Sequence, residues 1–289
     1  HCKTAPGQGR CFMKITKTSF NILMAVLVVL ICAFSLFPIV WALSTSFKTE
    51  AQVYALPPEW LPNPLSLVNY IEVFTTSQMG RYFWNTTVVS VGATGISLVI
   101  GIMAAYGFSR YKFPGAKTVL WSILFTRVLP RVTLIVPFYI TLRNLKLLNT
   151  YPGLILVYLM VVMPISVWLL KGFFDKVPYE IEEAAIVDGC SAFTLLTRII
   201  IPISMPAIAA VGMYTFILAW NEFLFALLMT TNAHTRTISV ALAFYIDEAG
   251  VHWGPLMAAS ILMSIPAIII FSLSQRQLVR GLSEGAVKG

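Results

Sequence analysis

The stretch from Glu182 to Pro206, EEAAIVDGCSAFTLLTRIIIPISMP, interrupts two long apolar runs with three acids, a glycine and an arginine. Just upstream, Pro178 suits the first turn of a helix, and the glutamates after it favour the positive end of the helix dipole. The alanine pair propagates the helix until Gly189 stops it. A second helical piece follows over Ser191 to Ile201, before Pro202 begins another apolar run. The pattern predicts two short helices joined by a turn, lying along a membrane surface.

The composition of this segment allows two interpretations. Small alanines on an exposed helix let another surface approach closely, and the acids around them can pair with arginines of a partner. An ordinary amphipathic loop helix has the same composition. The segment taken alone leaves both interpretations open.

The chain as a whole has the composition of a membrane protein. Hydrophobic residues make up 58% of its 289 residues, charged residues 11%, and the mean hydropathy is +0.81. A helix needs about 20 mostly apolar residues to cross a bilayer. We therefore expect an all-α integral membrane protein with six transmembrane helices, at Phe20–Leu43, Trp84–Ser109, Thr118–Leu142, Tyr151–Leu170, Ile199–Met229 and Gly254–Gln275.

The basic residues predict the orientation of these spans. On one side fall Lys3, Arg10, Lys14, Lys17, Arg110, Lys112, Lys117, Lys171, Lys176, Arg198, Arg276, Arg280 and Lys288. On the other fall Lys48, Arg81, Arg143, Lys146 and Arg236. Because basic loops stay in the cytoplasm, both termini and the 182–206 stretch are expected there, in a multi-pass protein of the plasma (inner) membrane.

Charge and cysteine patterns argue against other classes of protein. The net charge of +8 is scattered over short loops and forms no basic face, so nucleic-acid binding is not expected. The four cysteines show no paired spacing, which indicates neither a disulfide framework nor a zinc site. His234 and His252 lie too far apart in the sequence to suggest a metal site.

The rest of the chain is divided by the spans. Residues 1–19 form a cytoplasmic N-terminal tail, of which residues 1–12 read poorly as native sequence, whereas Met13 resembles a natural start. Residues 20–279 form the membrane domain, and residues 280–289 a cytoplasmic C-terminal tail. The external connection from Ser44 to Phe83 holds four prolines, which predict an extended path with little helix, serving as a lid, a docking loop or a spacer.

Polar residues inside the spans are candidates for a transport pathway. Arg127 and Arg131 lie four apart in the third span, on one expected helical face, with Pro130 between them. Each arginine at the centre of a bilayer costs about 2.5–3.5 kcal/mol by insertion scales, so both are expected to face protein or water. Snorkelling of Arg131 to the outer interface is the alternative.

A second polar cluster, Trp220, Asn221 and Glu222, lies in the fifth span. An aromatic face beside amide and carboxylate groups suits a sugar ring. Trp220 is also about 30 Å along a helix that starts at Ile199, close to the outer boundary, so interfacial anchoring at a helix end is an equal alternative.

The pattern Glu183-Ala184-Ala185, with Gly189 four residues on and Pro202 further along, resembles the EAA loop of permease subunits of binding-protein-dependent ABC importers. Ile201 stands where that family usually has leucine. Four other segments resemble the carbohydrate branch of the family, of the maltose and trehalose type: AAYGFSRYKFPGAK at 104–117, LNTYPGLIL at 148–156, WNEFLFALL at 220–228 and GLSEGAVKG at 281–289.

The resemblance implies a type I importer permease whose 178–202 loop carries a cytoplasmic coupling helix that seats in an ATPase subunit. It assigns that role to Glu182, Glu183, Ala184, Ala185, Asp188, Gly189 and Pro202. It also implies that Ser283, Glu284, Gly285, Ala286 and Val287 insert between the ATPase subunits. The implied partners are a second permease, two ATPase subunits that hold ATP and Mg, an external sugar-binding (lipo)protein of a prokaryote, and a disaccharide or oligosaccharide.

The sequence itself discriminates against two other functions. An ATP-independent secondary transporter or channel would also carry broken spans and intramembrane charges, but it has no reason to keep an EAA loop, and the two halves show no internal repeat. An intramembrane enzyme would need a nucleophile–base pair or a ligand set for a metal, and the spans hold neither. The sequence contains no GxxxxGK[ST] phosphate-binding loop, so the ATPase is expected to be a separate chain, and this chain is expected to bind no cofactor.

Overall fold

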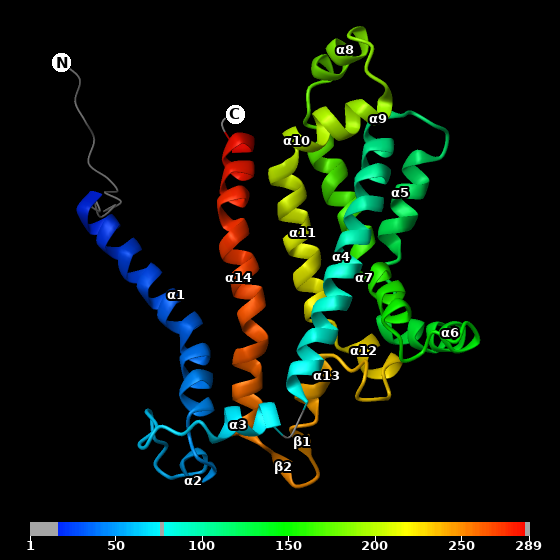
Figure 1. Ribbon diagram of the computed structural model, residues 1–289. Helices are drawn as coiled ribbons and strands as arrows, with labels where there is room; N and C mark the ends of the chain where they lie inside the picture. Colours follow the sequence, from blue (N-terminus) through cyan, green and yellow to red (C-terminus); the bar gives the residue numbers. More distant parts are fainter. Residues whose placement is uncertain (1–16, 76–77, 287–289) are drawn as a thin grey trace, which may run out of the picture.

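The computed structural model describes residues 17–75 and 78–286, and the side chains of residues 20–75 and 78–273. This part of the chain is helical apart from one short hairpin (Figure 1). The elements are α1 (Lys17–Ser46), α2 (Glu50–Val53), α3 (Val68–Thr75), α4 (Met79–Arg110), α5 (Ala116–Phe125), α6 (Arg131–Asn144), α7 (Tyr151–Phe174), α8 (Tyr179–Val187), α9 (Ala192–Leu195), the π-helix η1 (Leu196–Ile200), α10 (Ile201–Ile203), α11 (Met205–Trp220), α12 (Leu224–Met229), α13 (Ile238–Ala243), β1 (Ile246–Asp247), β2 (Gly250–Val251) and α14 (Trp253–Ala286).

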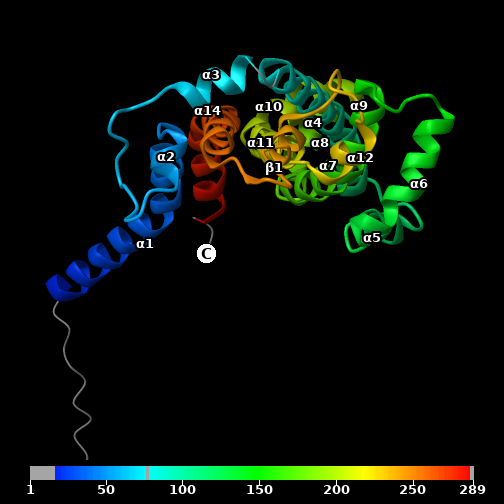
Figure 2. The ribbon, with the colours of Figure 1, turned by 90° about the horizontal axis from the view of Figure 1, so that it is seen from below.

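Four helices in the described part are long and apolar enough to cross a membrane: Phe20–Ser46, Met79–Arg110, Tyr151–Phe174 and Trp253–Leu273. A fifth crossing exists if Ala192–Ile203 and Met205–Trp220, which meet at 79°, form one bent span. The long helices run in roughly the same direction, with α1 splayed away from the bundle and packed on α14 (Figures 1 and 2). The chain is therefore a helical protein with four or five apolar spans.

The third predicted span, Thr118–Leu142, is not a continuous helix. It is broken into α5 and α6 by a turn over residues 126–130, and α6 projects to the side of the bundle (Figures 1 and 2). Pro130, at the N-cap of α6, has no N–H to donate, and a proline disfavours the helical conformation of the residue before it. The third of the six predicted spans is therefore not confirmed.

The fifth predicted span, Ile199–Met229, is also broken. The chain turns sharply at Ser204, and Pro206 lies in the first turn of α11, where the missing N–H costs nothing. A second break at residues 221–223 separates α11 from α12. Ala192–Ile203 and Met205–Trp220 together can form one bent span, and α12 lies beyond the second break.

Two connections contain more helix than the sequence indicated. The 280–286 segment, predicted as part of a C-terminal tail, continues α14 to Ala286, because extending an existing helix avoids the cost of nucleation. The Ser44–Phe83 connection contains α2, α3 and the start of α4, more helix than its prolines suggested. Val287 lies outside the described residues.

The centre of the bundle is formed by α4 packed along α7, with α11 against both. Small residues allow the close approach: a methyl group added to Gly101 would lie 3.2 Å from Cβ of Ser166. The hydroxyls of Ser97 and Ser166 are 2.7 Å apart and bond across the interface. Close packing of small and hydroxyl residues is the usual way in which helices associate in lipid. This closely packed centre connects the two ends that carry the candidate sites.

Candidate functional site

The helix expected around the EAA pattern is present as α8 and projects from one end of the bundle (Figure 1). Pro178 precedes its first residue, and Glu180 and Glu182 lie in its first turn, as the helix dipole favours. Gly189 has φ of +81°, a left-handed conformation that ends the helix, and the next amide, of Cys190, donates to the carbonyl of Ala185 at 3.0 Å. The predicted start and end of this helix are confirmed.

Glu182 faces the interior of the chain. Its carboxylate accepts a hydrogen bond from Nε of Arg110, at the end of α4, and another at 3.1 Å from the hydroxyl of Tyr106. The side chains of Arg110 and Glu182 are only 5% and 7% exposed. Arg110 also donates to the carbonyl of Val177 at 2.9 Å and lies 4.4 Å from the ring centre of Tyr179. This buried ion pair fastens α8 to α4.

Sequence reasoning missed Arg110. The sequence analysis uses this arginine only to predict the orientation of the spans in the membrane. The AAYGFSRYKFPGAK segment that contains it pointed to the family, but nothing in the sequence indicated that this arginine meets a carboxylate 72 residues away. Tyr106, from the same segment, was missed for the same reason.

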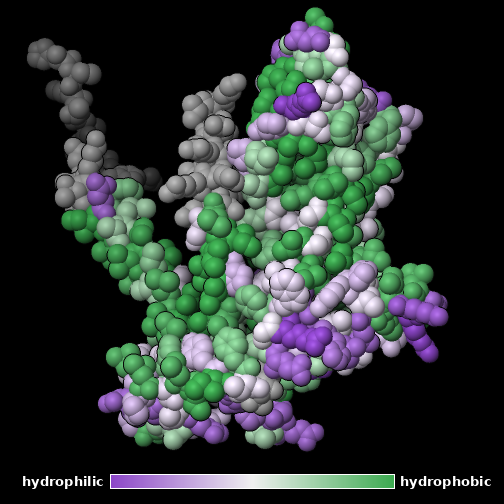
Figure 3. Space-filling model, viewed as in Figure 1, coloured by the Kyte–Doolittle hydropathy of each residue, from purple (hydrophilic) through white to green (hydrophobic). Residues whose placement is uncertain are grey.

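The outward side of α8 presents a different set of residues. Glu183, Ala184 and Asp188 are exposed, whereas Ala185 is buried beside Glu182. Large apolar side chains accompany the acids, and we call this surface the α8 face: it consists of Glu183, Ala184, Asp188, Ile186 (60% exposed), Val187 (86%) and Phe193 (75%). Hydrophobic and hydrophilic side chains lie next to each other at this end in Figure 3. Apolar residues exposed beside acids are typical of a protein-docking surface.

The chain after α8 returns to the bundle through an irregular helix. Ser191 caps α9 by accepting from the amide of Thr194 at 3.3 Å, and five residues of π-helix, η1, follow. Pro202 lies exposed in α10, just before the bend at Ser204. The buried residues of η1 and α9 pack with those of α4, α7 and α8 in one apolar cluster. The second helical piece expected at 191–201 is thus present, with a π-helical middle.

At the opposite end, Glu222 is almost fully buried in the break between α11 and α12. One carboxylate oxygen accepts from Nη1 of Arg131 at 3.1 Å, and the other accepts from the amide of Phe225 at 3.0 Å, which satisfies the first turn of α12. The carbonyl of Glu222 accepts from the hydroxyls of Tyr158 and Ser239. The structure therefore joins two predicted pathway residues, Arg131 and Glu222. We call them the outer ion pair, after the side on which the sequence predicts this end of the chain.

The sequence predicted that Arg127 and Arg131 lie on one helical face. In the structure they do not. Arg127 lies exposed in the turn after α5, and Arg131 is the first residue of α6, because Pro130 separates the two helices. Both line one small cavity of about 30 Å³, together with Met160, Val161 and Phe225. The turn between α5 and α6 thus brings the two arginines to the same cavity.

Trp220 lies inside the chain. Its side chain is 1% exposed, its indole N–H donates to the carbonyl of Met263 at 3.0 Å, and its ring packs against Phe83 and Phe216 at 5.4 and 5.5 Å. Asn221 is exposed, and its amide donates back to the carbonyl of Ile217. In this structure the ring of Trp220 is covered on the sides where a sugar would stack, so its expected role stays a prediction.

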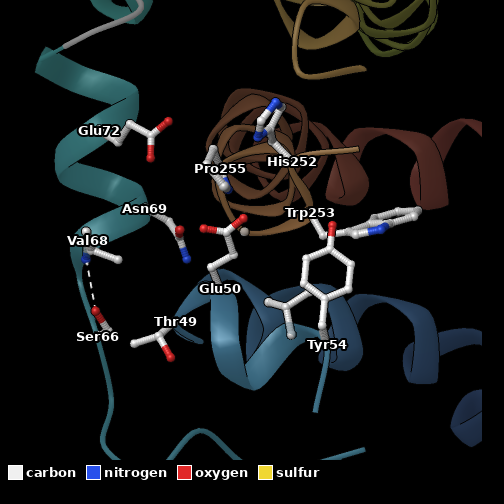
Figure 4. A pocket seen from close by; sticks show the side chains of 12 residues that line it. Thr49, Glu50, Tyr54, Ser66, Val68, Asn69, Glu72, His252, Trp253 and Pro255 are labelled. Atoms are coloured by element: carbon white, nitrogen blue, oxygen red, sulfur yellow. Dashed lines mark hydrogen bonds between the residues drawn. The ribbon is translucent and has the colours of Figure 1, made fainter. Parts of the chain in front are cut away.

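A pocket that the sequence did not indicate lies at the same end as the outer ion pair. It has a volume of about 440 Å³ and lies between α2, α3 and the start of α14 (Figure 4). The carboxylates of Glu50 and Glu72 and the rings of Tyr54 and Trp253 lie around it. Asn69 holds its floor in place by donating to the carbonyls of Ser46 and Lys48. We call it the external pocket.

The neighbouring hairpin carries an exposed ion pair. Nε2 of His252 lies 3.0 Å from a carboxylate oxygen of Asp247, and the other oxygen accepts from the amides of Ala249 and Gly250. The hydrogen bond with His252, assisted by these backbone bonds, holds the pKa of Asp247 below its usual range. Among the described residues, no group of three or more histidine, cysteine or acidic side chains could hold a metal ion.

The fold agrees with comparisons to known proteins. A family described as the binding-protein-dependent transport system inner membrane component matches residues 97–284. The sulfoquinovosyl glycerol transport system permease protein of Agrobacterium fabrum is 33% identical over 254 residues, which cover 88% of this chain and 89% of that protein. The trehalose/maltose transport system permease protein of Thermococcus litoralis is 34% identical over 284 residues, which cover 96% of this chain and 99% of that protein.

A solved structure has the same fold. It is a chain of a bacterial ABC transporter involved in the import of the acidic polysaccharide alginate, with a TM-score of 0.78 and 23% sequence identity, over 94% of this chain and 99% of that one. The family match covers more than half of the chain, and both relatives match over most of their length. This chain belongs to the family of inner membrane components of binding-protein-dependent transport systems.

Proposed function

We propose that this chain is the permease subunit of an ABC importer and forms half of the translocation pathway for a sugar, a disaccharide or an oligosaccharide. The observation that carries the proposal is α8: it projects from the bundle with an exposed acidic and apolar face, and its inner side is anchored to α4 by Arg110 and Glu182. The named relatives, which transport trehalose and maltose or sulfoquinovosyl glycerol, support a sugar as the substrate.

In this proposal α8 is the coupling helix of a type I importer. The α8 face seats in one of two ATPase subunits, which hold ATP and Mg. Because the buried ion pair ties α8 to α4, movement of the ATPase subunit reaches the bundle without being absorbed in the loop. The end of α14, at Ser283 to Ala286, extends toward the same end as α8 and supplies a further contact with the ATPase subunits (Figure 1).

The other end of the chain faces outward in this proposal, with both termini in the cytoplasm. A second, different permease completes the pathway, and an external sugar-binding protein delivers the solute to the end that carries the external pocket. A related solved transporter structure includes an alginate pentasaccharide-bound periplasmic protein, which supports such an arrangement. The outer ion pair and Arg127 lie at breaks in helices on this side and are proposed to line the pathway.

The experiment is transport by the complete complex reconstituted in liposomes, with trehalose and maltose as the probe solutes. The double variant Glu183→Lys, Gly189→Asp should keep the membrane-inserted subunit but lose ATPase association and sugar-stimulated ATP hydrolysis, because both changes fall on or next to the α8 face. Glu248→Gln, an exposed change on the external hairpin, is the control. Uptake that continues without ATP would support an ATP-independent carrier and contradict the proposal.

A further inference from the structure

The helix α5 is loosely packed on the described bundle. None of its ten residues, all of which the structure describes, is buried, and Trp121 and Phe125 are 62% and 61% exposed. It lies alongside α7, and between the two helices is a groove of about 380 Å³. We call this cavity the α5–α7 groove. A helix packed so loosely in a membrane needs something to fill the space beside it, because unfilled apolar space loses dispersion contacts.

The walls of the α5–α7 groove are apolar. Leu120 comes from α5, and Trp168 and Phe173 come from the last part of α7. Trp168 is 49% exposed, although it lies within a helix that can span a membrane. Tryptophan near the end of a spanning helix is typical of the headgroup level of a bilayer. The walls of the groove are therefore as apolar as an acyl chain, and its Trp168 end is expected at the headgroup level of the bilayer.

The end of the groove is basic. Lys171 pairs with Asp175 at 2.7 Å, and the carboxylate also accepts from the hydroxyl of Ser109 at 2.7 Å. Burial alone would raise the pKa of Asp175, but these hydrogen bonds outweigh it and hold the pKa below its usual range. Lys176 is exposed and has no carboxylate within ion-pair distance among the described side chains. The charges that line the groove thus leave one ammonium group unneutralised.

We propose that the α5–α7 groove binds an anionic phospholipid, with an acyl chain between Leu120, Trp168 and Phe173 and the phosphate at Lys176. The charge complementarity and the apolar walls together identify the ligand: a free phosphate would use only the lysine, and an uncharged lipid only the walls. A basic pocket between transmembrane helices is a known type of site for acidic headgroups. The bound lipid fills the space beside α5 and stabilises its packing on α7.

Gly172 allows a direct test, because it lines the groove and a methyl group added to it has no atom within 4 Å. Gly172→Leu should place apolar atoms in the groove from a Cβ that meets no neighbour, and leucine favours the helix more than glycine does. Gly95→Leu is the matched control: Gly95 also lies in a spanning helix with open space beside it but does not line the groove. Lys176→Gln removes the charge alone, and Lys112→Gln removes an exposed lysine elsewhere.

The measurement is native mass spectrometry of the complete transporter, delipidated and titrated with phosphatidylglycerol. Gly172→Leu should retain fewer phosphatidylglycerol molecules than the parent protein, and Lys176→Gln should weaken binding about fivefold, while both controls bind normally. Inorganic phosphate should not displace the lipid, and phosphatidylcholine should bind about fivefold more weakly.

Three results would overturn the proposal. Equal phosphatidylglycerol retention by Gly172→Leu and the parent would show that no lipid occupies the groove. Displacement by inorganic phosphate would show an anion site without an acyl chain. Protection of a cysteine placed at position 172 in the complex, with no lipid retained by the parent protein, would show that the second permease covers the groove.

Discussion

Two buried glutamates at opposite ends of the bundle are each paired with an arginine, but the pairs differ in exposure. At the α8 end, both Arg110 and Glu182 are shielded, with 5% and 7% of their side chains exposed. In the outer ion pair Glu222 is 3% exposed, whereas Arg131 is 47% exposed. In the first pair both side chains are shielded from solvent. In the second pair only the glutamate is shielded, and the arginine is half exposed.

The difference indicates how much freedom each end has. Breaking a pair that is buried on both sides leaves a charge without water or an opposite charge, and Glu182 would keep only the hydroxyl of Tyr106, so the α8 end should move with α4 as one body. Arg131 can exchange its partner for water, and Glu222 would keep the amide of Phe225. In the proposed function, the fully shielded pair suits an end that transmits movement, and the half-exposed pair suits an end that changes shape.

The largest effect is expected from Arg110→Leu. It leaves the buried carboxylate of Glu182 unpaired, which costs about 3–5 kcal/mol, so α8 should detach from α4 and lose hydrogen-exchange protection over residues 179–187. The double variant Arg110→Leu, Glu182→Leu should recover much of that protection, because no charge remains buried. Glu183→Gln, exposed on the same helix, is the control. Unchanged hydrogen-exchange protection of residues 179–187 in Arg110→Leu would show that the buried ion pair does not hold α8 on α4, and it would contradict the contrast between the two pairs.

A smaller loss of stability is expected from Arg131→Leu. Removing a charged hydrogen bond costs about 1.5–3 kcal/mol, reduced here because the arginine is half exposed and screened. Thermal unfolding of the purified subunit should shift less than for Arg110→Leu, while sugar uptake by the complex falls. Arg127→Leu, which breaks no ion pair among the described residues, should lower uptake without lowering stability. Equal stability losses at Arg110 and Arg131 would contradict the contrast between the two ends.

Substitutions of Gly189, in the turn after α8, test whether the ion pair of Arg110 and Glu182 is the main contact that holds this end of the chain in place. A methyl group at Gly189 would meet no atom within 4 Å, so the cost of Gly189→Val comes only from its left-handed backbone, at about 1–2 kcal/mol. Gly189→Asn should cost less, because asparagine tolerates that conformation. Hydrogen exchange at the amide of Cys190, which bonds the carbonyl of Ala185, reports the turn. Equal exchange rates in the two variants would show that the turn does not depend on the glycine.

The smallest effect is expected at the fully exposed pair of Asp247 and His252. Because the pKa of Asp247 is lowered in the folded hairpin, its contribution is complete above the ordinary aspartate pKa of about 3.9 and is lost as the pH falls through the lowered value. Exchange of the amides of Ala249 and Gly250, corrected for intrinsic rates, should therefore speed up only in that acidic window. Asp247→Asn should remove the pH dependence, whereas Glu248→Gln should keep it. A transition near neutral pH would assign the effect to another group.

The local features of this protein were predictable from the sequence. The apolar runs identified the long helices α1, α4, α7 and α14, since about 20 uncharged residues are readable without knowledge of neighbours. The limits of α8 followed from Pro178 and Gly189, which act on the backbone within one turn. The spacing of the EAA pattern pointed to the family, which the comparisons confirm.

Only the tertiary structure decided which way the polar residues face. Glu182 and Glu183 are adjacent and chemically alike, yet one is buried and the other exposed, because Arg110 meets α8 from 72 residues away. Likewise Glu222 finds Arg131 across 91 residues, and Trp220 is covered by Phe83 and by the carbonyl of Met263. Such contacts depend on how helices pack, and no local pattern encodes their distance. The break at Pro130 and the continuation of α14 were missed for a related reason: a hydropathy window measures the length of an apolar run but not whether the backbone hydrogen bonds are continuous along it.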